Sequence, residues 1–272
     1  MTDHPPANSV HEGVGRFEIF DFAPERLPAL RETVTGDRRP FSIHSPLSRR
    51  RGRLEPAHAV FFLSPDPARR ESSFVLVEET LAEAKEWGAE YVVAHMNWVD
   101  DSEDAPEARR LASGAARRLS QLSERYGVEL HVECGGYSGA FHHPDQFGAL
   151  AREFPGLGLC LDIGHLWLIA ESRGRSFFRD IETLAPHARS MHLWNAKDMA
   201  HYRRHHHVPL HPSQRPGDGW IDVERALAVV LERRPDCRLI FEYTWPSSEE
   251  ERVREGMSWV VSIAECHQRT AG

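Results

Sequence analysis

The chain has 272 residues, of which 40% are hydrophobic and 27% are charged, and its mean hydropathy is −0.50. This composition is that of an ordinary soluble globular protein with one large α/β domain, and no apolar run approaches the roughly 20 residues that a membrane-spanning helix needs. The net charge is −8, whereas proteins that bind nucleic acid phosphates usually have an excess of basic residues. The charge therefore disfavours nucleic acid as a partner.

The N-terminal segment and the cysteines bear on domain organisation and compartment. Residues 1–15 have neither a basic nor an apolar stretch, so we expect a flexible leader rather than a secretory signal, followed by a single catalytic domain over 16–272. The four cysteines are widely spaced without a C-x-x-C motif, which indicates free thiols in a reducing cytoplasm. The sequence does not determine whether the chain forms a homodimer.

Short apolar runs alternate along the chain with longer amphipathic ones. The predicted strands are 16–22, 41–47, 91–97, 129–135, 157–165, 190–195 and 239–243. The predicted helices are 72–88, 106–127, 221–234 and 248–268. Gly88 and Gly127 end the first two helices as C-caps, and Asp222 is the expected N-cap of the third. This alternation predicts βαβ units and a parallel sheet.

The number and character of the strands favour a barrel. The strands are nearly continuously apolar, as expected when both faces of a sheet are covered. We count seven strands where a closed (β/α)8 barrel has eight, and too few residues precede the first strand for an ordinary strand and helix. We therefore expect a TIM barrel with an abbreviated or missing first βα unit. A flavodoxin-like open sheet is the structural alternative, but it does not explain the polar strand ends.

Six predicted strands deliver a polar residue near their C-terminal ends: His44, His95, Glu133, Asp162, His192 and Glu242. In a barrel these ends converge on one mouth. Burying several carboxylates together without a cation costs several kcal/mol each. Three carboxylates with the His192 imidazole suit one divalent metal ion, namely Mn²⁺, Mg²⁺, Co²⁺, Fe²⁺ or Zn²⁺.

The segments HVEC, LDIGH, MHLWN and IFEY resemble the xylose-isomerase-like TIM-barrel superfamily over roughly residues 16–265. That superfamily includes sugar phosphate isomerases and epimerases, ketose 3-epimerases and the endonuclease IV branch. The resemblance implies a single divalent metal at Glu133, Asp162, His192 and Glu242. It also implies that Glu133 and Glu242 are catalytic and exchange a proton on either side of a carbon next to a carbonyl. His165 would bind a substrate oxygen or a further ion.

The resemblance thus favours a metal-dependent isomerase or epimerase acting on a sugar, a sugar phosphate or a related hydroxy-carbonyl compound. The alternative is a phosphodiesterase of the endonuclease IV (AP-endonuclease) type, because the segments MHLWNAKD, HHH and PGDGWID follow the order of that branch. Two departures weaken this alternative: Ser64 stands where that branch has a metal-binding His, and His205 replaces the Asp of its Asp-x-His pair. A lyase and a sugar-binding barrel on the same scaffold stay open.

The remaining candidates would bind a small polar, carbohydrate-like substrate. Residues 196–220 form a long segment rich in His, Arg and Pro, which is typical of a loop that carries substrate contacts. The proposed substrate-binding residues are His44, His95, Trp98, His165, Lys197 and His207. His207 could also share a second metal ion with His165. Trp194 and Trp245 follow the strand-end ligands and could form apolar walls.

Overall fold

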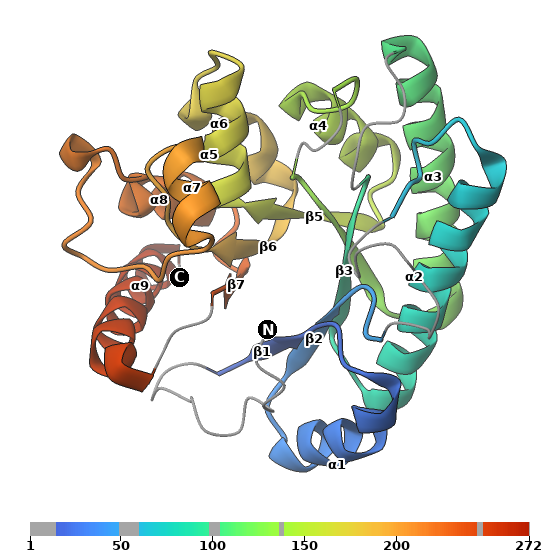
Figure 1. Ribbon diagram of the computed structural model, residues 1–272, viewed down its shortest axis with the longest axis horizontal. Coiled ribbons are helices and arrows are strands. Elements are labelled where there is room, and N and C mark those ends of the chain that lie inside the picture. Colours follow the sequence, from blue (N-terminus) through green and yellow to red (C-terminus); the bar gives the residue numbers. More distant parts are fainter. Residues whose placement is uncertain (1–14, 49–59, 98–103, 136–138, 244–246, 272) are drawn as a thin grey trace. The chain divides into compact units, whose positions relative to one another are not determined.

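The structure is a computed structural model that describes residues 15–48, 60–97, 104–135, 139–243 and 247–271. The predicted leader therefore lies almost wholly outside the described residues, as do Trp98 and Trp245. The described chain divides into two compact units, Gly15–Leu159 and 160–271 (Figure 1). The predicted single catalytic domain stays a prediction.

The described residues form a seven-stranded sheet, as the sequence predicted. The strands are β1 (Phe17–Ile19), β2 (Phe41–His44), β3 (Tyr91–His95), β4 (Glu129–Glu133), β5 (Leu157–Asp162), β6 (Ala188–Leu193) and β7 (Arg238–Phe241). Their order in the sheet is their order in the chain. The pairs β1–β2, β2–β3, β3–β4 and β6–β7 are parallel. A flavodoxin-like sheet reverses its strand order at a switch point, so the sequential order excludes that alternative.

All six polar residues picked out in the sequence lie at the C-terminal ends of strands. His44, His95, Glu133 and Asp162 are the last residues of β2, β3, β4 and β5. His192 is the last residue but one of β6, and Glu242 directly follows β7. In the parallel register of β3 and β4, His95 pairs with Glu133, so these two side chains start from the same level of the sheet.

The four predicted helices are present. They are α2 (Pro67–Trp87), α3 (Ala105–Tyr126), α8 (Val223–Leu231) and α9 (Glu250–Ala271). Gly88 and Gly127 follow α2 and α3 with φ of +80° and +65°, which confirms both as left-handed C-caps. The Asp222 side chain accepts a hydrogen bond from the backbone N–H of Arg225, so the predicted N-cap is also confirmed.

Five further α-helices were not predicted: α1 (Leu27–Asp37), α4 (Pro144–Glu153), α5 (Ile163–Ser172), α6 (Phe177–Leu184) and α7 (Met199–His205). Short 3-10 helices span Pro24–Arg26, Ala185–His187, Pro216–Asp218 and Ser247–Glu249. The predicted strand 157–165 was too long, because the chain turns helical at Ile163 and His165 lies on α5. Helix α5 is apolar on nearly every side, so it lacks the polar face by which a helical period is recognised.

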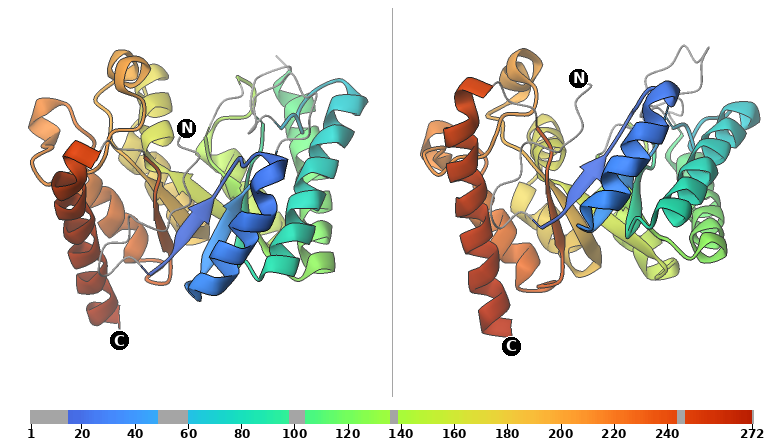
Figure 2. Two further views of the ribbon diagram at one scale, coloured as in Figure 1. Left: turned by 60° about the horizontal axis from the view of Figure 1, so that its bottom comes forward. Right: turned by 90° about the horizontal axis from the view of Figure 1, so that it is seen from below.

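The helices pack along the strands within each unit. In Gly15–Leu159, α2 and α3 lie side by side and contact β3 and β4 (Figures 1 and 2). In 160–271, α8 packs against α9 and α6 against α5 (Figure 2). The cysteines Cys134, Cys160 and Cys237 are buried free thiols, as predicted, and burial raises the pKa of the Cys237 thiol. None of the described helices is long and apolar enough to cross a bilayer.

Candidate metal centre

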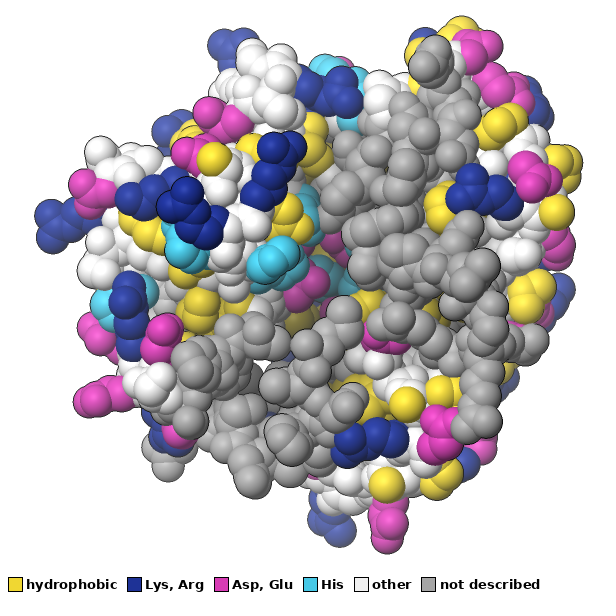
Figure 3. All heavy atoms as spheres, in the orientation of Figure 1, with side chains coloured by type: hydrophobic (Ala, Val, Ile, Leu, Met, Phe, Trp, Pro, Cys, Tyr) yellow, Lys and Arg dark blue, Asp and Glu magenta, His cyan; other side chains and the backbone are white. Residues whose placement is uncertain are grey.

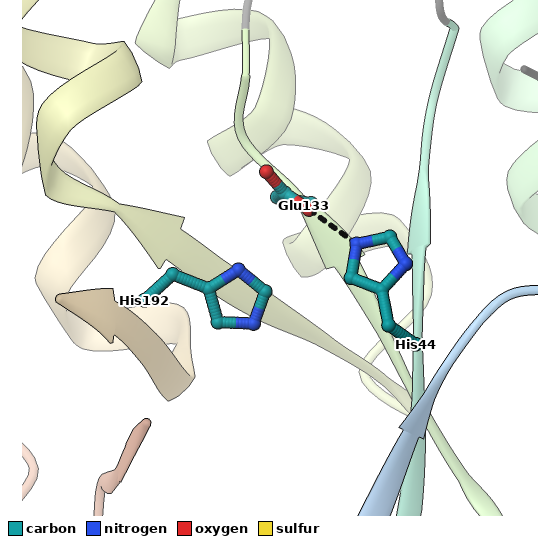
Figure 4. Close-up of side chains that lie close together, drawn as sticks. All are labelled: His44, Glu133 and His192. Atoms are coloured by element: carbon teal, nitrogen blue, oxygen red, sulfur yellow. Dashed lines mark hydrogen bonds and ion pairs between the residues drawn. The ribbon is translucent and has the colours of Figure 1, made fainter. Parts of the chain in front are cut away.

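Glu133 lies at the end of β4 with its carboxylate held by two imidazoles. The Nε2 atoms of His44 and His95 lie 2.9 Å and 2.8 Å from the same oxygen, Oε2 of Glu133. All three side chains are buried, and Glu133 is only 3% exposed. Figure 4 shows His44 and Glu133 pointing toward one another from β2 and β4. Two of the predicted substrate-binding residues therefore contact the predicted catalytic glutamate.

Both ring nitrogens of His44 have a hydrogen-bond partner. Its Nδ1 is 3.0 Å from the carbonyl oxygen of Ser45, and a carbonyl can only accept, so Nδ1 carries a proton. The contact between Nε2 and Oε2 of Glu133 needs a further proton, which makes His44 an imidazolium or Glu133 a carboxylic acid. Glu133 thus lies within hydrogen-bonding distance of buried imidazoles that orient its carboxylate.

Asp162, His192 and Glu242 form a second group, from β5, β6 and the residue after β7. Each offers one ligand atom, and these atoms all lie within 4.8 Å of one another. Nδ1 of His192 is 3.1 Å from Oε2 of Glu242. Asp162 and His192 are fully buried, whereas the Glu242 side chain is 36% exposed (His192 is labelled in Figure 4). One unit of the chain thus supplies three of the four predicted ligands at metal-binding spacing.

The Glu242 carboxylate has one buried oxygen, Oε2. Apart from its 3.1 Å contact with Nδ1 of His192, this atom accepts no hydrogen bond within the part of the chain that the structure describes. A buried carboxylate oxygen costs free energy unless it is bonded to a donor or a cation. Two carboxylates and an imidazole are ligands that Mn²⁺, Co²⁺, Fe²⁺ and Zn²⁺ accept readily, so the residues present suit a divalent metal.

Asp162 has a structural role as well. It is the N-cap of α5: its Oδ1 accepts a hydrogen bond of 2.7 Å from the backbone N–H of His165. Its Oδ2 accepts the indole N–H of Trp194 at 2.9 Å. Nε2 of His165 lies 3.8 Å from the same Oδ2 atom. The two hydrogen bonds therefore fix the orientation of the carboxylate that we predict to be a metal ligand.

Trp194 lies between a glycine and a histidine. It is fully buried, and its ring is stacked on the His207 ring with centroids 4.1 Å apart and an interplanar angle of 10°. On Gly164, a Cβ atom would lie only 2.2 Å from Cε2 of Trp194, so the indole rests directly on the backbone of α5. Trp194 is therefore a support for Asp162 rather than an open wall for substrate.

His165, Tyr202 and His207 surround the edge of Trp194. The His165 ring meets Trp194, His207 and Tyr202 edge-on, with centroid distances of 5.0, 5.5 and 5.8 Å. Nδ1 of His207 donates to the carbonyl oxygen of Glu242 at 2.9 Å. The structure thus brings His165 and His207 together, while the second metal ion between them stays a prediction.

Tyr202 was not picked out from the sequence, although it belongs to this cluster. It lies on α7 within residues 196–220, which we expected to be a loop, and is only partly buried. Burial, together with the negative charges of Asp162 and Glu242, raises the pKa of the Tyr202 phenol. The sequence did contain a signal for α7, because Asp198 is a typical N-cap and Tyr202 follows it by one helical turn. We interpreted this segment as part of a loop.

Lys197, a predicted substrate-binding residue, contacts two tryptophans outside the aromatic cluster of Trp194. Its ammonium nitrogen lies 5.0 Å from the ring centroid of Trp220, and its carbonyl accepts the indole N–H of Trp167. Arg203, Arg204 and His205 of α7 are exposed. Figure 3 shows side chains of Lys, Arg and His on the molecular surface. These contacts anchor the backbone of Lys197, and a role in substrate binding stays a prediction.

Parallel βα units with carboxylate and imidazole side chains at the C-terminal ends of the strands define a class of α/β proteins with a polar site at that edge. The sequence pattern of one family, described as xylose isomerase-like TIM barrel, matches residues 9–263. The chain belongs to this family, which confirms the predicted barrel and the resemblance seen in the sequence.

Solved structures of similar fold are distant in sequence. A D-tagatose 3-epimerase-like protein is 15% identical with a TM-score of 0.67, covering 95% of this chain and 91% of its own. An L-ribulose 3-epimerase is 14% identical with a TM-score of 0.66, covering 96% and 88%. A xylose isomerase-like TIM barrel protein from Mycobacterium smegmatis in complex with magnesium is 14% identical with a TM-score of 0.58, covering 93% and 85%. No curated protein matches the sequence.

Proposed function

We propose that the protein is a divalent-metal-dependent isomerase or epimerase that acts on a sugar, a sugar phosphate or a related hydroxy-carbonyl compound. The observation that carries this proposal is the group of Asp162, His192 and Glu242, whose ligand atoms lie within 4.8 Å of one another. The sugar 3-epimerases among the similar structures support the same reaction class and a carbohydrate substrate.

The metal would be held by Asp162, His192 and Glu242, with Glu133 as the fourth ligand. The magnesium complex among the similar structures, and another similar protein soaked with zinc chloride, support a divalent ion. Glu133 enters as a ligand because it ends β4, the strand that precedes β5 in the sheet, and because the resemblance implies it. The contacts of its Oε2 atom with His44 and His95 would hold the carboxylate in one orientation.

Proton transfer next to a carbonyl needs two things that these residues can supply. A bound divalent ion would polarise the substrate carbonyl and stabilise the negative charge of the enediolate. Glu242 and Glu133 would each work on one face of the reacting carbon, one carboxylate removing its proton and the other returning a proton to the opposite face. His44 and His95 would keep Glu133 oriented and supplied with a proton through its Oε2 atom.

The substrate would be positioned by imidazoles. His165 and His207 lie beside the Asp162 carboxylate and the backbone of Glu242, so their ring nitrogens can bond substrate hydroxyls. His44, His95, Trp98 and Lys197 remain proposed contacts on the reasoning from the sequence alone. A Mg²⁺, Mn²⁺, Co²⁺, Fe²⁺ or Zn²⁺ ion and a small polar substrate would together complete the site.

The experiment that tests this proposal is metal analysis of the purified protein combined with paired variants. We expect one divalent ion per chain in the wild type, and loss of that ion in His192→Ala. Glu133→Gln and Glu242→Gln should lose at least 100-fold in epimerisation, because each removes one acid–base group. Glu224→Gln, an exposed glutamate on α8, serves as the matched control and should retain full activity.

Other outcomes would overturn the proposal. Two or three ions per chain together with cleavage of an abasic-site duplex would support the endonuclease IV type instead. Full epimerase activity in both Glu→Gln variants would exclude proton transfer by these two residues. A wild type that binds no divalent ion with useful affinity would exclude the metal-dependent mechanism.

A further inference from the structure

Tyr202 lies in the aromatic cluster next to the proposed ligands, yet the proposed reaction gives it no role. Its ring packs against three residues of the cluster: the ring centroids of Trp194, His165 and His207 are 5.4, 5.8 and 6.0 Å away. Trp194 is fully buried, whereas Tyr202 and His207 are partly exposed. Tyr202 is therefore on the accessible side of the cluster, where a ligand could reach it.

The backbone around Tyr202 is held in place at both ends of α7. Asp198 caps the N-terminus by accepting the N–H of His201 at 2.7 Å. At the C-terminus, the N–H of His206 donates to the carbonyl of Tyr202 itself at 2.7 Å. His206 adopts φ +53° and ψ −140°, a region that side-chain-bearing residues rarely occupy. The hydrogen bond from His206 thus ends the helix at Tyr202 and holds its backbone.

The Tyr202 hydroxyl is a neutral hydrogen-bond donor, as a phenol ordinarily is at neutral pH. Its ring lies in one cluster with His165 and His207, the two imidazoles proposed to bond substrate hydroxyls. A phenol grouped with two imidazoles is suited to a ligand with several hydroxyl groups, because these side chains can bond neighbouring hydroxyls.

We propose that Tyr202 is a specificity-determining residue that donates a hydrogen bond to a hydroxyl of the bound ketose. This inference rests on the proposed function, and it names a contact that sets affinity for the polyhydroxylated substrate rather than the proton transfer. Packing of the aromatic ring would hold the hydroxyl in position, and the hydroxyl would donate a hydrogen bond to one oxygen of the sugar. A substrate analogue that lacks this oxygen should not distinguish the wild type from a variant without the hydroxyl.

The test uses Tyr202→Phe, which keeps the ring and its packing and removes only the hydroxyl. Binding of D-tagatose and D-fructose to the manganese-loaded protein is measured by calorimetry, and deuterium uptake from D₂O is measured on the same sugars. One lost hydrogen bond between neutral groups should weaken binding and lower kcat/KM about threefold to tenfold. Manganese content and thermal midpoint should be unchanged, because neither depends on the hydroxyl.

Tyr126→Phe is the matched control. The Tyr126 hydroxyl donates to Glu78 on the surface of α2 and α3, outside the site, so its removal should leave sugar binding unchanged. Equal sugar affinity and kcat/KM in wild type and Tyr202→Phe would overturn the inference while leaving the proposed function standing. A wild type that binds no member of a broad panel of ketoses and ketose phosphates and exchanges no deuterium on any of them would overturn the proposed function and this inference with it.

Discussion

Gly164→Ala tests whether Trp194 is held between α5 and His207. The added Cβ would lie 2.2, 2.3 and 2.5 Å from Cε2, Cζ2 and Cδ2 of Trp194. Ordinary carbon contacts are about 3.5–4.0 Å, so the indole would have to move by more than about 1 Å. His207 is stacked on the indole at 4.1 Å and is itself tied to the carbonyl of Glu242, so this movement meets resistance.

The magnitude follows from two contributions. Overpacking of a well-packed interior costs about 1–3 kcal/mol. If the indole swings away, its hydrogen bond to the Asp162 carboxylate is also lost, which costs about 1.5–3 kcal/mol. The better helix propensity of Ala returns at most about 1 kcal/mol. We therefore expect a loss of about 2–5 kcal/mol in the free energy of unfolding, or about 4–20 °C in Tm for a chain of this size.

The assay is urea unfolding followed by circular dichroism, with thermal melts alongside. Gly114→Ala is the matched control, because Gly114 is an exposed helical glycine of α3 with nothing within 4 Å of a Cβ. That control should gain about 0.5–1 kcal/mol, so the same substitution has opposite signs at the two positions. A Gly164→Ala protein within about 1 kcal/mol of the wild type would refute the packing of Trp194 described here.

Three further substitutions or conditions give measurable outcomes. Trp194→Phe removes the N–H that orients Asp162, so the free energy of unfolding in urea should fall by about 1.5–3 kcal/mol. Calorimetry should also show weaker Mn²⁺ binding. If both values are unchanged, Trp194 does not support Asp162. His206→Gly relieves backbone strain and should raise the free energy of unfolding by about 0.5–2 kcal/mol, whereas a loss would show that the conformation costs nothing. Burial raises the pKa of the Tyr243 phenol, so the stability linked to its proton is complete below the unfolded pKa of about 10 and is lost as the pH rises above it. Urea midpoints should therefore fall above about pH 10, and Tyr243→Phe should flatten that fall; an equal slope in the variant would exclude Tyr243 as the cause.

Much of the fold was predictable because its determinants are local. Each strand is indicated by a short apolar run. The helix ends are indicated by single residues, namely the C-caps Gly88 and Gly127 and the N-cap Asp222. Helix α5 was missed because its residues are apolar all round, so the run from Leu157 to His165 looked like one buried strand. Asp162 is both the last residue of β5 and the N-cap of α5. We interpreted it only as a strand residue, so the start of α5 was missed.

The candidate site was partly predictable for a different reason. Parallel strands put their C-terminal residues at one edge, so strand ends alone pointed to Asp162, His192 and Glu242. The partners of these residues could not be predicted, because they depend on packing between segments distant in sequence. The hydrogen bond from the Trp194 indole to Asp162 and the packing of the Tyr202 ring against Trp194 are contacts of this kind.

Solvent deuterium incorporation tests the central claim most directly. Manganese-loaded wild type is incubated with D-tagatose or D-fructose in D₂O, and the recovered sugar is analysed by NMR. We expect one deuterium on the carbon next to the carbonyl, with incorporation that disappears on chelation and in Glu242→Gln. A fully metal-loaded protein that leaves every hydrogen of a broad ketose panel in place, or that exchanges equally well after the metal is removed, would contradict metal-dependent proton transfer.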